Sequence, residues 1–213
     1  MSDERSHQGH DHGPDGHEPP PDIPESYPEH MTTAVLELLV EKGILTAEEV
    51  QREIEIIERR TPAIGAKVVA RAWTDPQFRE RLLHDATAAV AELGIDMGSS
   101  EARLSVVENT PNEHNVVVCT LCSCYPRALL GLPPAWYKSY AYRSRVVREP
   151  RAVLREFGLD IEPNRTVRVH DSTANSRFLV IPVRPGGTEN WTEERLASIV
   201  TRDAMVGVGV VSI

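Results

Sequence analysis

The chain has 213 residues, of which 40% are hydrophobic and 26% charged, and its formal net charge is −9. This length and apolar content predict one medium-sized domain with an appendage. The acidic balance disfavours nucleic acid as a partner, because duplex binding depends on Lys and Arg that neutralise phosphates. No segment is apolar over the roughly 18 to 20 residues that cross a membrane, and the polar start does not resemble a signal peptide, so we expect a cytoplasmic protein without a membrane partner.

Residues 1–30 form the first predicted part of the chain. Gly, Pro and acidic residues surround its histidines, which are His7, His10, His12, His17 and His30. Because the segment has almost no apolar residue to bury, we expect a disordered tail. Two interpretations of the closely spaced histidines remain open: a solvated tail without function, and a loose chelator that holds a divalent metal for delivery.

Residues 31–100 form the second predicted part, a helical arm followed by core helices. Order is expected to begin near Thr32, and the first helix ends at Gly43. Thr46 and Glu49 have the spacing of a capping box for a second helix, which Thr61-Pro62 ends. These two amphipathic helices could pack on each other or clasp a partner subunit. Two core helices then follow, at 66–73 and 74–93.

Residues 101–213 form the third predicted part, which mixes strands and helices. Short β-rich runs predict strands at 104–107, 115–119, 166–169 and 178–183. Helices are expected at 140–147, at 150–157 and from Thr192 onward. The fold class is therefore α+β, with a helical N-terminal arm followed by a domain of mixed strands and helices.

All three cysteines lie within six positions, Cys119, Cys122 and Cys124, directly after a predicted strand. No disulfide can therefore link distant parts of the fold. A structural zinc site would need a fourth ligand, for which His114 is the candidate. A Cys-x-x-Cys redox pair usually opens a helix, and a deaminase-type zinc site needs a His-x-Glu motif that the sequence lacks.

The spacing also allows a claw-shaped metal site. Because Cys122, Ser123 and Cys124 are consecutive, a metal held by both thiolates can take the deprotonated backbone nitrogens of Ser123 and Cys124 as ligands. With Cys119 as a third sulfur, the sixth coordination position stays open for substrate or water. Such strong anionic donors favour a low-spin trivalent ion over zinc. Thiolates of this kind can also be oxidised to sulfenic and sulfinic acids.

The claw segment reads Val118-Cys-Thr-Leu-Cys-Ser-Cys124 and resembles the metal motif of nitrile hydratase α subunits. Further matching runs extend the resemblance over about residues 32–208: 66–76, 130–138, 142–151 and 199–203. The resemblance implies a layered α-β-β-α domain and a helical arm that wraps around a separate β subunit. It also implies hydration of a small nitrile to an amide, with the metal as a Lewis acid.

The family further implies that Cys122 becomes a sulfinic acid and Cys124 a sulfenic acid, while Cys119 stays a thiolate. Arginines of the β subunit would hold the oxidised sulfurs, and an activator would insert the metal. Thr120 and Tyr125 resemble the cobalt branch, which implies non-corrin Co(III) rather than iron. The nucleophile is either metal-bound water or the Cys124 sulfenate. Tyr125 either orients the substrate or metal shell, or only packs.

Two departures from the family leave the substrate open. Most members carry Trp where this chain has Arg127, which with Trp136 is expected in the substrate pocket, and a Gln-Gly-Glu motif is replaced at Ser100-Glu101. The γ subunit of thiocyanate hydrolase resembles this chain in having Arg at that point, and a guanidinium suits an anionic substrate. Alternatively, Arg127 faces solvent or a subunit interface. A third hypothesis, from another class, is a non-catalytic metal-binding or redox-sensing module.

Overall fold

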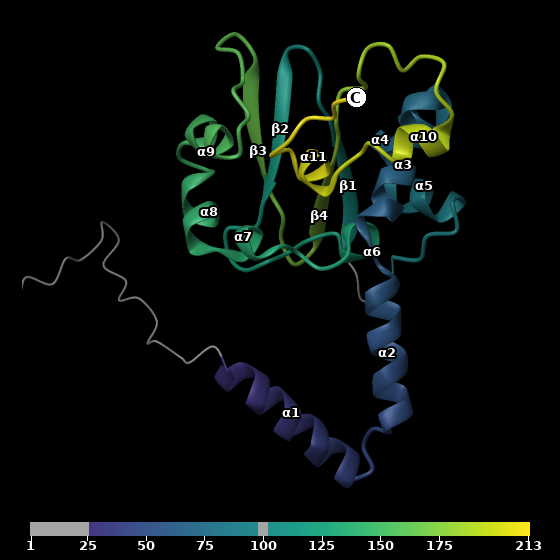
Figure 1. Ribbon diagram of the computed structural model, residues 1–213, viewed down its shortest axis with the longest axis vertical. Helices are drawn as coiled ribbons and strands as arrows, with labels where there is room; N and C mark the ends of the chain where they lie inside the picture. Colours follow the sequence, from purple (N-terminus) through teal and green to yellow (C-terminus); the bar gives the residue numbers. More distant parts are fainter. Residues whose placement is uncertain (1–25, 98–101) are drawn as a thin grey trace, which may run out of the picture. The chain divides into compact units, whose positions relative to one another are not determined.

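A computed structural model describes residues 26–97 and 102–213 and divides the chain into two units, 1–51 and 52–213 (Figure 1). Within the first unit, α1 (Ser26–Glu41) begins earlier than the Thr32 expected and includes residues 26–30 of the predicted tail. The hydroxyls of Thr32 and Thr33 donate back to carbonyls of its first turn. The predicted tail up to residue 25 and the Ser100-Glu101 position lie outside the described residues. No helix in the described ranges is long and apolar enough to span a membrane.

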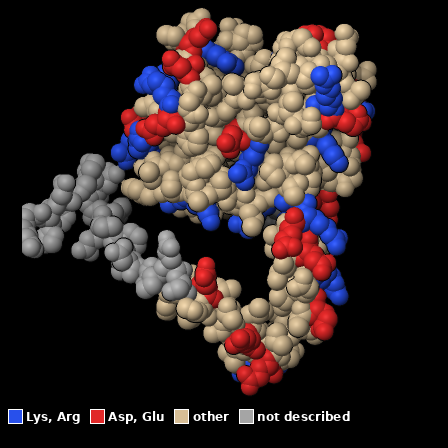
Figure 2. Space-filling view, in the orientation of Figure 1, with Lys and Arg blue, Asp and Glu red and all other residues tan. Residues whose placement is uncertain are grey.

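Helix α2 (Ala47–Arg59) starts at the predicted capping box. The Thr46 backbone N–H donates to the Glu49 carboxylate at 2.8 Å, and the Glu49 N–H donates to the Thr46 hydroxyl at 3.1 Å. These reciprocal bonds satisfy two N–H groups that the helix itself cannot pair. No residue of α2 is buried, and Figure 2 shows acidic side chains along both α1 and α2. Apolar side chains such as Leu38 and Ile54 are exposed on the same two helices, so both helices present an amphipathic surface to solvent.

Helix α3 (Pro62–Thr74) confirms the first core helix, but the helix expected over 74–93 is wrong as a single element. It is divided into α4 (Pro76–His84) and α5 (Ala86–Glu92). At the break, Asp85 leaves the helical conformation, and its carboxylate accepts the N–H of Ala88 at 3.2 Å. Asp side chains compete with helix hydrogen bonding in this way and favour helix starts over helix interiors.

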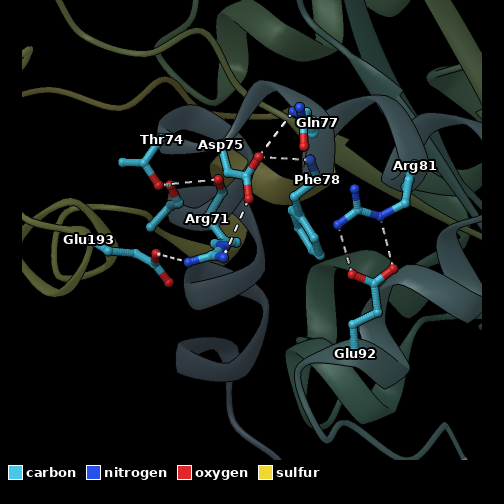
Figure 3. A network of polar contacts seen from close by, with 9 residues as sticks. Arg71, Thr74, Asp75, Gln77, Phe78, Arg81, Glu92 and Glu193 are labelled. Carbon is cyan, nitrogen blue, oxygen red and sulfur yellow. Dashed lines mark hydrogen bonds and ion pairs between the residues drawn. The ribbon is translucent and has the colours of Figure 1, made fainter.

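Asp75 makes the same kind of cap between α3 and α4 (Figure 3). It accepts the N–H groups of Gln77 and Phe78, each at 3.0 Å. The Phe78 N–H is the largest cause of a lowered pKa for the Asp75 carboxyl, so the cap stays ionised at neutral pH. Beside it, Arg71 pairs with Asp75 at 3.3 Å and with Glu193 at 3.4 Å. These contacts fix the turn between α3 and α4 and tie it to Glu193.

All four predicted strands are confirmed. They are β1 (Arg103–Glu108), β2 (Glu113–Val118), β3 (Thr166–Asp171) and β4 (Ser176–Ile181). β1 pairs with β4 and β2 with β3, both in parallel, as two two-stranded sheets. Because β2 and β3 pair in parallel, with Val118 opposite Asp171, their carboxyl ends lie at the same end of the sheet. This placement brings the cysteine loop beside residues 171–177.

Helices cover the two sheets, which gives the expected layered α+β fold (Figure 1). α4 and α5 pack on β1, and α9 packs on β3. The remaining elements are α6 (Arg127–Leu130), α7 (Ala135–Lys138), α8 (Tyr140–Arg145), α9 (Pro150–Glu156), α10 (Glu193–Ala197) and α11 (Arg202–Val206). The helices expected at 140–147, at 150–157 and after Thr192 are confirmed. The short helices α6, α7 and α11 carry too little periodicity to be predicted.

Gly207 allows α11 to approach β2. Its φ of +88° is a left-handed conformation, and a Cβ built there would lie 1.9 Å from the Asn115 carbonyl oxygen. Only glycine relieves both constraints, because it has no Cβ and adopts positive φ freely. The close approach supports the buried valines of β2, which lead into the cysteine loop.

We expect Gly207→Ala to lower the free energy of unfolding by about 3 kcal/mol or more, since the new methyl group adds a backbone clash to the conformational strain. Gly158→Ala is the matched control, because Gly158 has φ +80° but nothing within 4 Å of the position that a Cβ would occupy. The control should lose only about 1 kcal/mol. Urea unfolding of both variants measures the difference, and equal losses would contradict the proposed close approach.

Candidate metal centre

Three thiols converge where β2 ends. The Cys119 side chain is 1% exposed at the end of a buried strand, Cys124 is half-buried, and Cys122 is exposed. The Sγ atoms of Cys119 and Cys122 are 3.6 Å apart, and those of Cys122 and Cys124 are 3.4 Å apart. All three sulfurs lie within 4.8 Å of one another, and no other such cluster of His, Cys, Asp or Glu occurs in the described ranges. The predicted metal ligands therefore share one site.

The thiols influence one another strongly. Burial, followed by the Cys122 and Cys119 sulfurs, raises the pKa of Cys124 to about 12, while the positive charge of Arg177 opposes the shift. The hydrogen bond with the Cys124 sulfur is the largest cause of a lowered pKa for Cys122. Three thiolates this close repel one another unless a cation lies between them. The donor set thus fits a bound metal ion, as the spacing predicted.

The first residue of the loop is held on both sides. The Asp171 carboxylate at the end of β3 accepts the Thr120 backbone N–H at 2.9 Å and the Thr120 hydroxyl at 2.6 Å. The Arg143 guanidinium of α8 donates to the Thr120 carbonyl at 3.2 Å. Because Thr120 directly follows Cys119, these bonds fix where the loop leaves the strand.

Aromatic side chains of α7 and α8 hold the backbone on both sides of the cysteine loop. The Tyr137 hydroxyl donates to the Cys124 carbonyl at 2.8 Å, and the Tyr142 hydroxyl donates to the Val117 carbonyl at 2.6 Å. Tyr125 is buried edge-on against Tyr137, with ring centroids 5.0 Å apart. The Tyr125 hydroxyl has no hydrogen-bond partner among the described residues, and burial raises its pKa. Tyr137 therefore positions Cys124, and Tyr125 packs behind it.

Ser123 is partly buried between the two thiols of the claw. The two predicted pocket residues lie farther along the chain. Arg127 is exposed at the first position of α6. Trp136 is half-buried, with its ring 4.9 Å from the rings of Tyr142 and Phe157. No hydrogen bond or ring contact in the described part of the chain joins either residue to the thiols, so their predicted role in substrate binding stays a prediction.

The zinc alternative that recruits His114 is wrong. His114 lies at the other end of β2, is fully buried, and uses both ring nitrogens on the Gly207 carbonyl and the Asn109 side chain. Arg177 lies near the site: it donates to the Thr173 and Ser176 carbonyls, and its charge acts on Cys124. In the described residues it makes no surface salt bridge.

Sequence reasoning missed Asp171, Arg143 and Tyr137. A signal for Asp171 was present, because a polar residue that ends a predicted strand can meet a loop at the end of a neighbouring parallel strand. The strand pairing itself was not readable from the sequence. Arg143 and Tyr137 belong to matching runs but carry no metal-ligand pattern of their own.

A family profile described as "Nitrile hydratase, alpha chain" matches residues 26–209. The chain belongs to this family. It is 53% identical over 177 residues to the cobalt-containing nitrile hydratase subunit alpha of Pseudonocardia thermophila, a match covering 82% of this chain and 86% of the relative. It is also 42% identical over 192 residues to the thiocyanate hydrolase subunit gamma of Thiobacillus thioparus, covering 85% of this chain and 79% of the relative.

Solved structures of the nitrile hydratase family and its relatives share the fold. A double mutant of the Fe-type nitrile hydratase from Comamonas testosteroni Ni1 superposes with a TM-score of 0.84 at 40% identity, covering 89% of this chain and 92% of that one. A recombinant thiocyanate hydrolase with partially modified cobalt centres superposes with a TM-score of 0.83 at 42% identity, covering 88% and 91%. The resemblance noted in the sequence is thereby confirmed, together with the layered fold.

Proposed function

We propose that the chain is the metal-bearing α subunit of a cobalt nitrile hydratase, which adds water to a nitrile to give an amide. The observation that carries this proposal is the convergence of Cys119, Cys122 and Cys124 within 4.8 Å. The relative from Pseudonocardia thermophila, 53% identical, is a cobalt-containing nitrile hydratase. In the overall reaction the water oxygen bonds to the nitrile carbon, and the nitrogen gains the protons.

The three thiolates, with the backbone nitrogens of Ser123 and Cys124, would hold Co(III), and iron is the less favoured ion. When bound, the cobalt supplies Lewis acidity that polarises a C≡N nitrogen or lowers the pKa of water. The residues of the chain would hold the donor atoms in place. Asp171 and Arg143 fix Thr120, and Tyr137 fixes the Cys124 carbonyl, so the donor atoms keep one geometry. Such supporting bonds tune metal affinity and activity.

The exposure of Cys122 supports its oxidation to a sulfinic acid with dioxygen as the oxidant, and the partly exposed Cys124 would be oxidised by dioxygen to a sulfenic acid while buried Cys119 stays a thiolate. Arginines of a β subunit would hold the oxidised sulfurs, and an activator would load the cobalt in the cytoplasm. In this assembly, the residues before α1 would serve as a tail, the segment from α1 to residue 100 as arm and core helices, and residues 101–213 as the catalytic domain. Mass spectrometry should then find two added oxygens on Cys122 and one on Cys124.

The exposed side of the cysteine loop supports the proposal that a partner subunit covers it. Leu121, between the first two cysteines, is 86% exposed. The cavity of about 760 Å³ between α2, α3 and α5 is not the substrate pocket of the metal centre. No residue from Cys119 to Arg127 lines it, and Ala128 is its only lining residue from α6. A β subunit that covers Leu121 would complete the substrate pocket and keep bulk water away from the metal.

Arg127 favours a second candidate, hydrolysis of thiocyanate to carbonyl sulfide and ammonia. The family relative from Thiobacillus thioparus is a thiocyanate hydrolase subunit. The Arg127 side chain is exposed in the described chain and free to face a pocket completed by a partner. A guanidinium there would attract an anion and gain little from a neutral nitrile.

We expect Arg127→Trp to raise the ratio of nitrile to thiocyanate turnover by about tenfold, equivalent to about 1.4 kcal/mol. The reason is that tryptophan removes the positive charge of Arg127, which would attract thiocyanate but not a neutral nitrile. Arg127→Lys retains the charge and should leave the ratio within about threefold, because the contact is electrostatic rather than bidentate. Values of kcat/KM for both substrates measure the ratio, and unchanged values in both variants would place Arg127 outside the pocket.

Co-expression with the neighbouring partner subunit in cobalt medium tests the proposed function itself. The expected result is one cobalt per chain, oxidised Cys122 and Cys124, and turnover of a small nitrile above that of thiocyanate. Faster turnover of thiocyanate would support the second candidate. Bound zinc with unoxidised cysteines would instead support a non-catalytic metal-binding or redox-sensing module.

A further inference from the structure

A second polar site lies at the end of the strands opposite the thiols. A cavity of about 230 Å³ opens where β1 and β4 end and where β2 and β3 begin. Its lining comes from Asn109, His114, Arg165, the segment 182–186 and the segment 209–211. The volume is below the range of pockets for drug-sized ligands, so any ligand must be small.

The lining is positively charged. It contains Arg165 and Arg184 but no Asp or Glu. The Arg184 guanidinium donates to the Thr188 hydroxyl at 3.1 Å, to the Trp73 carbonyl at 3.0 Å and to the Thr188 carbonyl, so all three nitrogens have neutral partners and the positive charge is not paired with an acid. Hydrogen bonds from the backbone N–H groups of Glu189 and Gly187 are the main causes of a lowered pKa for Glu189, and the charge of Arg184 adds to the shift. The Glu189 carboxylate is exposed and accepts the Gly187 N–H at 3.0 Å. Both arginines therefore belong to the wall of the cavity, which contains no acidic residue, and Arg184 contributes its positive charge rather than a free donor.

Arg165 has an unused donor. One terminal nitrogen of its guanidinium donates to the Glu113 carbonyl at 3.3 Å. Its Nε is fully enclosed by the protein, so a ligand in the cavity cannot reach it, and it has no acceptor among the described residues. The other terminal nitrogen makes no hydrogen bond within the described residues and is the donor left for a ligand, and a guanidinium matches the oxygens of carboxylates and phosphates.

His114 adds no charge of its own. Its ring is 0% exposed, and burial lowers its pKa, with the positive charge of Arg165 adding to the shift. Its Nε2 donates to the Gly207 carbonyl at 2.7 Å, so Nδ1 is the acceptor for the Asn109 amide at 3.3 Å. The floor of the cavity is thus neutral and fixed, and the charge comes from the two arginines.

We propose that this cavity binds a small oxyanion, either inorganic phosphate or a short carboxylate, with Arg165 as its main contact and Arg184 as a second positive charge. The site is separate from the metal centre and does not depend on the proposed catalytic function. Because the ion would join residues before β2 and β3 to the segments after β4 and α11, its binding should also stabilise the fold.

Calorimetric titration of phosphate and of acetate into the purified full-length protein, in the complex in which it is isolated, tests the proposal at constant ionic strength set with chloride. At least one of the two ions should bind saturably, and the responding ion distinguishes a phosphate site from a carboxylate site. Arg165→Gln should weaken that binding by about tenfold or more, since a hydrogen bond to a charged group is lost. Arg165→Lys should restore part of the affinity.

Arg168→Gln is the matched control. Arg168 lies three positions further along the same segment, pairs with Glu113 at 3.0 Å and does not line the cavity, so its loss should leave anion affinity unchanged. Val210→Glu places an acid in the lining at a residue that is 56% exposed, and should abolish binding even if Arg165→Gln fails to fold. No saturable binding of either ion, or equal affinity in the wild type, Arg165→Gln and Val210→Glu, would overturn the proposal.

Discussion

Replacing Cys122 by alanine is expected to remove the metal and with it nitrile hydration. Its sulfur lies 3.6 Å from that of Cys119 and 3.4 Å from that of Cys124, so it is the member common to both close pairs. Losing a direct ligand should cost more than the 10- to 100-fold that supporting residues typically cost, so we expect a fall of at least about 100-fold in both metal affinity and kcat/KM. Cobalt per chain by elemental analysis and nitrile turnover measure the two effects.

Ser123 provides the matched controls, because its predicted contribution is a backbone nitrogen rather than its hydroxyl. Ser123→Ala retains that nitrogen and should retain the metal. Ser123→Pro has no N–H to lose and should not load cobalt, although the thiols on either side are intact. Metal loss in Ser123→Ala, or full cobalt in Cys122→Ala, would contradict the claw arrangement.

Asp171→Asn is expected to reduce nitrile turnover by about 10- to 100-fold while leaving the fold intact. The carboxylate accepts two bonds from Thr120, at 2.9 Å from the backbone nitrogen and 2.6 Å from the hydroxyl. An amide carries no charge and has one acceptor oxygen, so the hydroxyl must reverse its role or lose its partner, both bonds lose their charge assistance, and the exit of the loop from β2 is loosened. Because Asp171 is exposed, its replacement should change the free energy of unfolding by less than about 1 kcal/mol.

Thr120→Val separates the two bonds of Asp171, since valine keeps the backbone N–H and removes only the hydroxyl. If Asp171 acts through Thr120, the double variant should be no worse than Asp171→Asn alone. Asp160→Asn, an exposed acid elsewhere in the chain, is the control for charge and should leave turnover unchanged. Additive losses in the double variant would show that Asp171 acts by another route.

Local patterns in the sequence were sufficient for much of the fold. The four strands, the Thr46–Glu49 capping box and the helix start at Thr192 are each specified by residues within a few positions of one another. Patterns failed where two local signals competed. The apolar face continued from Phe78 to Leu93, yet the side chain of Asp85 capped a new helix and divided the element.

The sequence by itself determined the three thiols and their closeness, because six consecutive positions of one loop cannot place them far apart. Only the tertiary structure decided what surrounds them. Thr120 and Asp171 are 51 positions apart, and their contact follows from the parallel pairing of β2 with β3, which no local pattern specifies. The extended conformation of β2 holds His114 at the opposite end of the strand from Cys119, away from the thiols, and the fold places it in the floor of a second, cationic site.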